Sequence, residues 1–81
     1  MKREELVGIV SRAVAANGGE ATIVQVAEYI WKNHEAELKA SGDLFYTWQY
    51  EMRWAAQSLR NQGKLELGRK SGKNTWRKVG N

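Results

Sequence analysis

The 81-residue chain contains no cysteine and no proline. Without cysteine, neither a disulfide nor a thiolate metal site can support the modest core that a chain of this length can bury. Its apolar runs are short, which excludes a transmembrane helix and the apolar segment of a secretory signal. We therefore expect a single domain over residues 1–81, without membrane association and cytoplasmic by default.

Carboxylates are scarce in the C-terminal part of the chain. Residues 53–81 carry eight Lys or Arg and a single Glu, a net charge of +7, whereas residues 1–52 carry five Lys or Arg and eight Asp or Glu, a net charge of −3. A one-sided asymmetry of this kind favours a polyanionic partner. Solubility is the plainer explanation, and the total charge of +4 does not separate the two.

Apolar periodicity predicts three helices. Residues 3–16 space their apolar side chains at i, i+3, i+4 and i+7, and Thr22 with Gln25 forms a capping-box pattern before a second helix at residues 23–39. A third helix is expected at about residues 47–62, closed by Gly63. Its apolar side comprises Trp48, Met52, Ala55, Ala56 and Leu59.

Short extended segments flank these helices. Residues 20–22 form a link before the second helix, and residues 64–67 and 75–79 alternate as two strands would. The basic residues 68–74 lie between them as a long loop. The resulting order is helix, short strand, helix, helix, strand, loop, strand. This mostly α arrangement with a small β-hairpin (α+β) is that of a winged helix-turn-helix, in which the hairpin is the wing.

The polar side of the third helix has no carboxylate. Arg can form two hydrogen bonds with guanine, and Gln with adenine, in the major groove of DNA. Phosphates need only cations and small donors, which residues 68–74 supply. A solvated helix face and a lysine-protected strand edge are the alternative interpretations. The predicted contacts with double-stranded DNA are Thr47, Gln49, Tyr50, Arg53, Gln57 and Arg60 on the helix, and Arg69, Lys70, Ser71, Lys73 and Asn74 on the wing, with Lys2 and Arg3 as additional arms.

Nothing in the sequence indicates catalysis. His34 is the only histidine, and without cysteine or a matched carboxylate spacing a metal site is not expected. Glu35 and Glu37, at i and i+2, do not share a helix face and make a poor acid/base pair. No serine has a plausible His and Asp partner. We therefore expect no enzymatic activity, metal, cofactor or small-molecule substrate. Most of the four tryptophans are expected in the core, whereas Tyr46 and Tyr50 are expected at the surface.

Residues 53–65, "RWAAQSLRNQGKL", contain Trp-Ala, three residues, Leu, three residues and Gly. This pattern resembles the N-terminal winged-helix domain of Mrr-type restriction endonucleases. The "GGEA" link at residues 18–21 and the "GKNTWRKV" segment at residues 72–79 also fit that family. The resemblance implies a winged helix that binds DNA, with Gln49, Arg53 and Gln57 facing the groove and residues 69–74 in the wing.

The resemblance does not imply cleavage, because the nuclease domain of that family is a separate, later module. A complete chain would bind without cutting, and a fragment would be the recognition part of a larger protein. A small regulator or a mobile-element protein would fit the first case. The alternative hypothesis is a winged helix that docks on an acidic protein partner through its third helix or wing, and a homodimer or a larger protein partner stays open.

Overall fold

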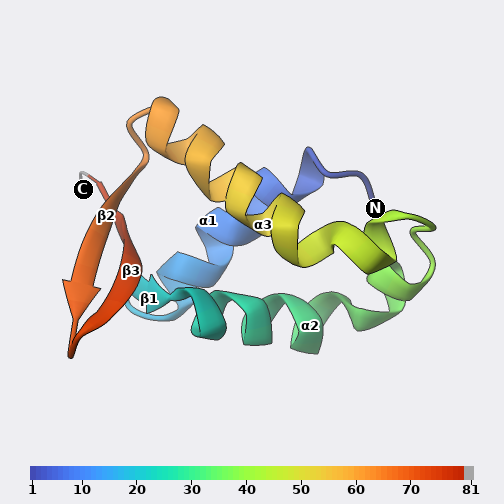
Figure 1. Cartoon of the computed structure of the whole chain (residues 1–81), viewed down its shortest axis with the longest axis horizontal. Helices are drawn as coiled ribbons and strands as arrows, with labels where there is room; N and C mark the ends of the chain where they lie inside the picture. Colours follow the sequence, from blue (N-terminus) through green and yellow to red (C-terminus); the bar gives the residue numbers. More distant parts are fainter. Residues whose placement is uncertain (80–81) are drawn as a thin grey trace.

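Three helices and three strands make up the part of the chain that the structure, a computed structural model, describes, residues 1–79. In chain order the elements are α1 (Glu5–Ala16), β1 (Glu20–Thr22), α2 (Ile23–Lys39), α3 (Leu44–Asn61), β2 (Leu65–Lys70) and β3 (Lys73–Lys78) (Figure 1). The fold is α+β, with a small antiparallel sheet at one end of the three helices. The predicted order of elements is confirmed, and the bounds of α2 are those expected from the capping box.

The core lies between the apolar faces of the helices. The predicted face of α1 is buried throughout, and so are the five predicted apolar residues of α3. The helix α2 contributes Val26, Ile30 and Leu38, and the sheet closes one end with Ala21, Leu65 and Trp76. The sequence pattern therefore located the buried faces of α1 and α3 correctly, because burial of such apolar faces is what holds helices of this length together.

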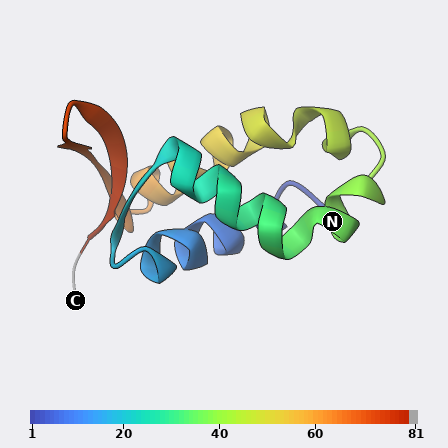
Figure 2. The same cartoon turned by 90° about the horizontal axis from the view of Figure 1, so that it is seen from below.

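The last strand, β3, is the central strand of the sheet. The strand order is β1-β3-β2 and both pairings are antiparallel, so β3 joins the link before α2 to the strand that follows α3. In both views the sheet stands at the end of the molecule opposite the N-terminus (Figures 1 and 2). Figure 2 also shows the turn of the β2–β3 hairpin on the same side of the molecule as α3, with α1 on the other side.

The hairpin differs from the prediction. Residues 68–74 do not form a long loop: β2 continues to Lys70, β3 begins at Lys73, and only Ser71 and Gly72 form the turn. Both turn residues have positive φ, 53° and 79°, as a two-residue type I′ turn requires. The basic composition suggested a loop, but long charged side chains are compatible with strand positions whose side chains are in solvent.

The third helix also begins earlier than expected, at Leu44 instead of residue 47. Backbone hydrogen bonds from Leu44 to Ser41 and from Phe45 to Gly42 form a tight turn that leads directly into the helix. Asp43 is a residue type that often caps helices, but here it has helical φ and ψ and its side chain makes no cap hydrogen bond. Tyr46 and Thr47 therefore belong to the first turn of α3.

A close contact in the sheet involves Gly68. Thr75 on β3 is 1% exposed, and its hydroxyl donates a 2.6 Å hydrogen bond to the Glu20 carboxylate on β1. Gly68 of β2 lies opposite Thr75. A Cβ atom at Gly68 would lie 2.7 Å from Thr75 Oγ1 and 2.9 Å from Glu20 Oε2. The hydrogen bond between β1 and β3 thus occupies space that only a glycine in β2 leaves free.

Candidate nucleic-acid interface

The six residues of α3 predicted to contact DNA are all exposed. They follow one side of the helix from its first turn to its last, opposite the buried side formed by Trp48, Met52 and their neighbours. Tyr50 is 71% exposed and Tyr46, in the first turn, 83%, which confirms the expectation that these two aromatic side chains lie at the surface. The structure therefore brings the predicted helix residues together on one accessible face.

Hydrogen bonds within α3 arrange the C-terminal half of this face. Arg60 Nη1 donates to Gln57 Oε1 at 3.1 Å, and Gln57 Nε2 donates to Asn61 Oδ1 at 3.0 Å. These exposed contacts fix the guanidinium and the amide relative to each other without neutralising the charge of Arg60. Arg53 forms no ion pair with any of residues 1–79. Both arginines are thus free to meet an anion.

The basic residues of the hairpin lie on two faces. Lys70 and Lys73 are direct cross-strand partners next to the turn, and Arg69 pairs with Asn74 one position further from it. Side chains alternate along a strand, so Arg69 and Asn74 share the face of the sheet that contains Trp76, while Lys70 and Lys73 point to the opposite face. All five predicted hairpin residues, Ser71 included, are exposed.

Like charges directly opposite each other destabilise an antiparallel pair. Within residues 1–79, Lys70 and Lys73 have no carboxylate in an ion pair to offset this repulsion. Further along the hairpin the charge is compensated, because Arg77 Nε lies 2.7 Å from Glu66 Oε1. The excess positive charge of the hairpin is therefore concentrated at its turn.

The sequence did not indicate that a carboxylate would lie beside the α3 face. A groove of about 790 Å³ runs between α2 and α3, and its lining includes Gln49 and Arg53 from α3 and Glu28 from α2. Trp31 also lines this groove and is 36% exposed. It is the exception among the four tryptophans, because Trp48 and Trp76 are buried and Trp54 packs against the core. The Trp31 ring stacks on that of Trp48 at 6.1 Å. Sequence periodicity describes each helix alone and could not place α2 residues beside α3.

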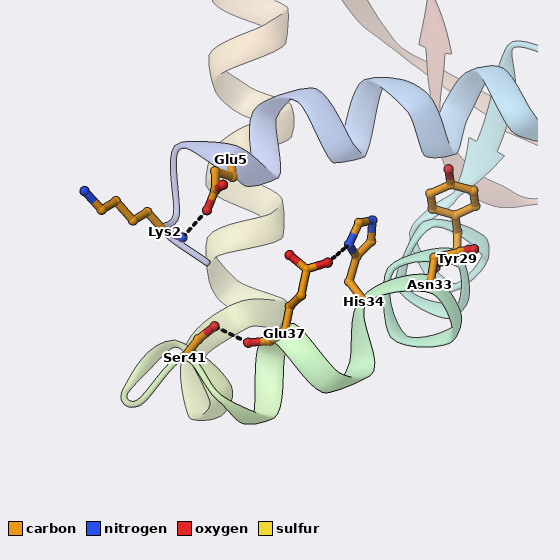
Figure 3. A network of polar contacts seen from close by, with 7 residues as sticks. All are labelled: Lys2, Glu5, Tyr29, Asn33, His34, Glu37 and Ser41. Carbon is orange, nitrogen blue, oxygen red and sulfur yellow. Dashed lines mark hydrogen bonds and ion pairs between the residues drawn. The ribbon is translucent and has the colours of Figure 1, made fainter.

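The N-terminal segment is attached to α3. The guanidinium of Arg3 lies 3.7 Å above the centre of the Trp54 ring, and its Nε is 3.1 Å from a Glu51 carboxylate oxygen. Arg3 is therefore not the free arm that the sequence suggested. The backbone N–H of Lys2 donates to the carboxylate of Glu5, and the Lys2 side chain points away from the helices (Figure 3). The N-terminus lies at the end of the molecule opposite the hairpin (Figure 1).

His34 lies at a kink in α2. Its φ of −133° is not helical, and its Nδ1 is 2.9 Å from Glu37 Oε1, while the Ser41 hydroxyl donates to the carbonyl of Glu37 (Figure 3). These contacts hold the kink and the end of the helix together.

Residues 1–79 contain no cluster of three side chains suited to a metal ion. In the same residues, no helix has the length and apolar character needed to span a membrane.

Comparison with known proteins identifies no relative: no protein-family model, curated protein or solved structure matches this chain. The resemblance to the N-terminal domain of Mrr-type endonucleases therefore stays a prediction. A function for this chain has to be inferred from the exposed face of α3 and from the cations at the hairpin turn.

Proposed function

We propose that the chain is a winged helix-turn-helix that binds double-stranded DNA. In this arrangement α3 enters the major groove, where Gln49, Arg53 and Gln57 contact base edges. The hairpin acts as the wing, and cations on one of its faces, together with Arg60, hold backbone phosphates. Thr47 and Tyr50 contact the backbone from the exposed side of α3.

The observation that carries the proposal is that the exposed cations of α3 and of the hairpin turn lack carboxylate partners within residues 1–79. Arg53 and Arg60 on α3 and the Lys70–Lys73 pair at the hairpin form no ion pair within residues 1–79. Glu66, the only carboxylate from residue 53 onward, is already paired with Arg77. Self-repulsion of this kind is relieved when phosphates replace water and counterions.

The tight turn changes what the wing can contact. A long loop could place all its cations on one strand of a duplex, but a two-residue turn holds Lys70 and Lys73 on one face of the hairpin and Arg69 on the other. Only one of these faces can lie against a given stretch of backbone. We therefore expect either Arg69 or the lysine pair, but not both, to contribute strongly to affinity.

Fluorescence anisotropy with a labelled random-sequence duplex tests the proposal. Binding should weaken as salt increases, with log K falling linearly in log [salt] and a slope set by the number of phosphates contacted. Lys70→Ala should reduce that slope by about 1 if Lys70 contacts a phosphate. Absence of binding even at low ionic strength would rule out DNA as the partner. An affinity almost independent of salt would favour the protein-docking alternative.

Arg53→Ala tests the base-edge assignment. Loss of an arginine that reads guanine should cost about 1–3 kcal/mol on a preferred site and relax specificity at one position. Arg12→Ala is the matched control, because Arg12 is an exposed arginine that belongs to α1 and not to α3 or the hairpin. Equal losses for the two variants would show that only total charge matters and that α3 does not read bases.

A further inference from the structure

The groove between α2 and α3 is an apolar surface that DNA contact does not explain. Its exposed apolar side chains are Val24 and Trp31 on α2 and Tyr46 on α3, and Val24 is 64% exposed. Contiguous exposed apolar residues mark an interaction site more often than isolated ones do. Aromatic residues such as Trp and Tyr are also enriched in protein interfaces.

The two walls of the groove carry opposite charges. Glu28 lines it from α2 and Arg53 lines it from α3, and neither forms an ion pair within residues 1–79. A nucleic acid seated in the groove would bring its phosphates near Glu28, which repels them. A protein surface with apolar residues and both charge signs is a better match for this lining.

A second copy of the chain offers such a surface, because each copy carries Glu28 on one wall of the groove and Arg53 on the other. A two-fold axis along the groove would place the α2 wall of one copy on the α3 wall of the other. Glu28 of each copy would then meet Arg53 of its mate, so that two ion pairs form around facing apolar residues. Such isologous contacts, in which the same patch serves both subunits, are the commonest way for a soluble protein to dimerise.

We propose that the α2–α3 groove is the contact surface of a homodimer, held by reciprocal Glu28–Arg53 pairs around Val24, Trp31 and Tyr46. The dimer would cover Gln49 and Arg53, which are also the proposed base-reading residues. Self-association and DNA binding then exclude each other, a consequence that rests on the proposed function. The dimer is a storage form, and the monomer is the form that binds DNA.

Charge reversal with rescue tests the dimer. Sedimentation equilibrium is measured from low micromolar to submillimolar concentrations for the parent, Glu28→Arg, Arg53→Glu and the double variant. Each reversal places two like-charge contacts in the symmetric dimer, so each single variant should raise the dimer dissociation constant at least about tenfold. The double variant restores opposite charges and should dimerise like the parent. A simple loss of folding could not produce this recovery.

A parent protein that is monomeric at every concentration would overturn the proposal, as would a double variant as monomeric as the single ones. Val24→Glu is an independent variant: it places a charge in the apolar part of the groove and should also abolish dimerisation. Circular dichroism checks that each variant keeps its helices, which is expected because all three side chains are exposed.

The link between dimerisation and DNA binding has its own readout. Adding duplex to the parent dimer should yield monomer bound to DNA, and Glu28→Arg, which leaves the proposed DNA contacts intact, should bind DNA more tightly than the parent at concentrations where the parent is dimeric. If the charge-reversal series behaves as expected but no variant binds DNA, the dimer stands and the proposed function fails. If DNA binds the dimer without dissociating it, the mutual exclusion is wrong.

Discussion

Replacing Gly68 with alanine should destabilise the fold although it adds only one methyl group. The new Cβ would lie 2.7 Å from Thr75 Oγ1 and 2.9 Å from Glu20 Oε2. Both atoms belong to the partly buried hydrogen bond that joins β1 to β3. Relief of the overlap requires either that this bond lengthens or that β2 moves away from β3.

The loss of stability expected for Gly68→Ala follows from these two ways of relieving the overlap. Breaking a buried hydrogen bond to a charged group, or forcing an extra methyl into a packed site, costs about 1–3 kcal/mol. Alanine itself should recover about 0.5–1 kcal/mol relative to glycine, because it lowers the conformational entropy of the unfolded chain. We therefore expect a net loss of about 1–2 kcal/mol in the free energy of unfolding.

Urea unfolding followed by tryptophan fluorescence measures this loss, and Gly8→Ala is the matched control. Gly8 lies within α1, where a Cβ would meet only the flexible end of Arg12 at 3.5 Å, so the same substitution should stabilise the protein by about 0.5–1 kcal/mol. In a Thr75→Ala background the penalty at Gly68 should shrink, because one of the two close contacts is gone. A Gly68→Ala variant as stable as the parent would refute the steric argument.

Other substitutions test local features of the fold. Thr22→Ala removes the capping-box hydrogen bond to the N–H of Gln25 and should cost about 1 kcal/mol in thermal or urea unfolding. Arg3→Ala removes the cation from the Trp54 ring and should cost about 0.5–1 kcal/mol, with a change in tryptophan emission. Ser71→Asn should stabilise the hairpin by about 0.5 kcal/mol, because asparagine tolerates positive φ better than serine does. An unchanged midpoint would argue against a type I′ turn.

The sequence predicted the parts of the fold that depend on local pattern. Apolar spacing located the buried faces of α1 and α3, and the pairing of Thr22 with Gln25 marked the start of α2 to the residue. Both signals are contained within a few consecutive residues. The start of α3 was missed because a backbone turn, and not a capping side chain, leads into it.

The hairpin shows how composition can mislead. Three cations and several small polar residues suggested a loop, but the Ser71-Gly72 dipeptide was a turn signal of the right length. With the turn reduced to these two residues, the alternation of strand side chains sets Lys70 and Lys73 apart from Arg69. The five hairpin residues predicted to contact DNA are all exposed. Which face of the hairpin each one occupies depends on the register between β2 and β3, which the composition did not indicate.

The groove could not be predicted at all. Glu28 and Trp31 come from α2, and Gln49 and Arg53 from α3. Their proximity depends on how the two helices cross, which is a property of the packed structure. Val24 and Trp31 are exposed at this groove although both are apolar, whereas Val26 and Ile30 of the same helix are buried.

Thr22 belongs to two elements at once. It is the last residue of β1, paired with Thr75, and its hydroxyl caps the first turn of α2. No flexible linker therefore separates the sheet from this helix, and a displacement of the hairpin is transmitted through β3 and β1 to the start of α2. The hairpin, β1 and the first turn of α2 should therefore move together, and their amide hydrogens should exchange with solvent as a single cooperative unit. A force that bends the hairpin would then tilt α2 against α3 and change the width of the groove between them.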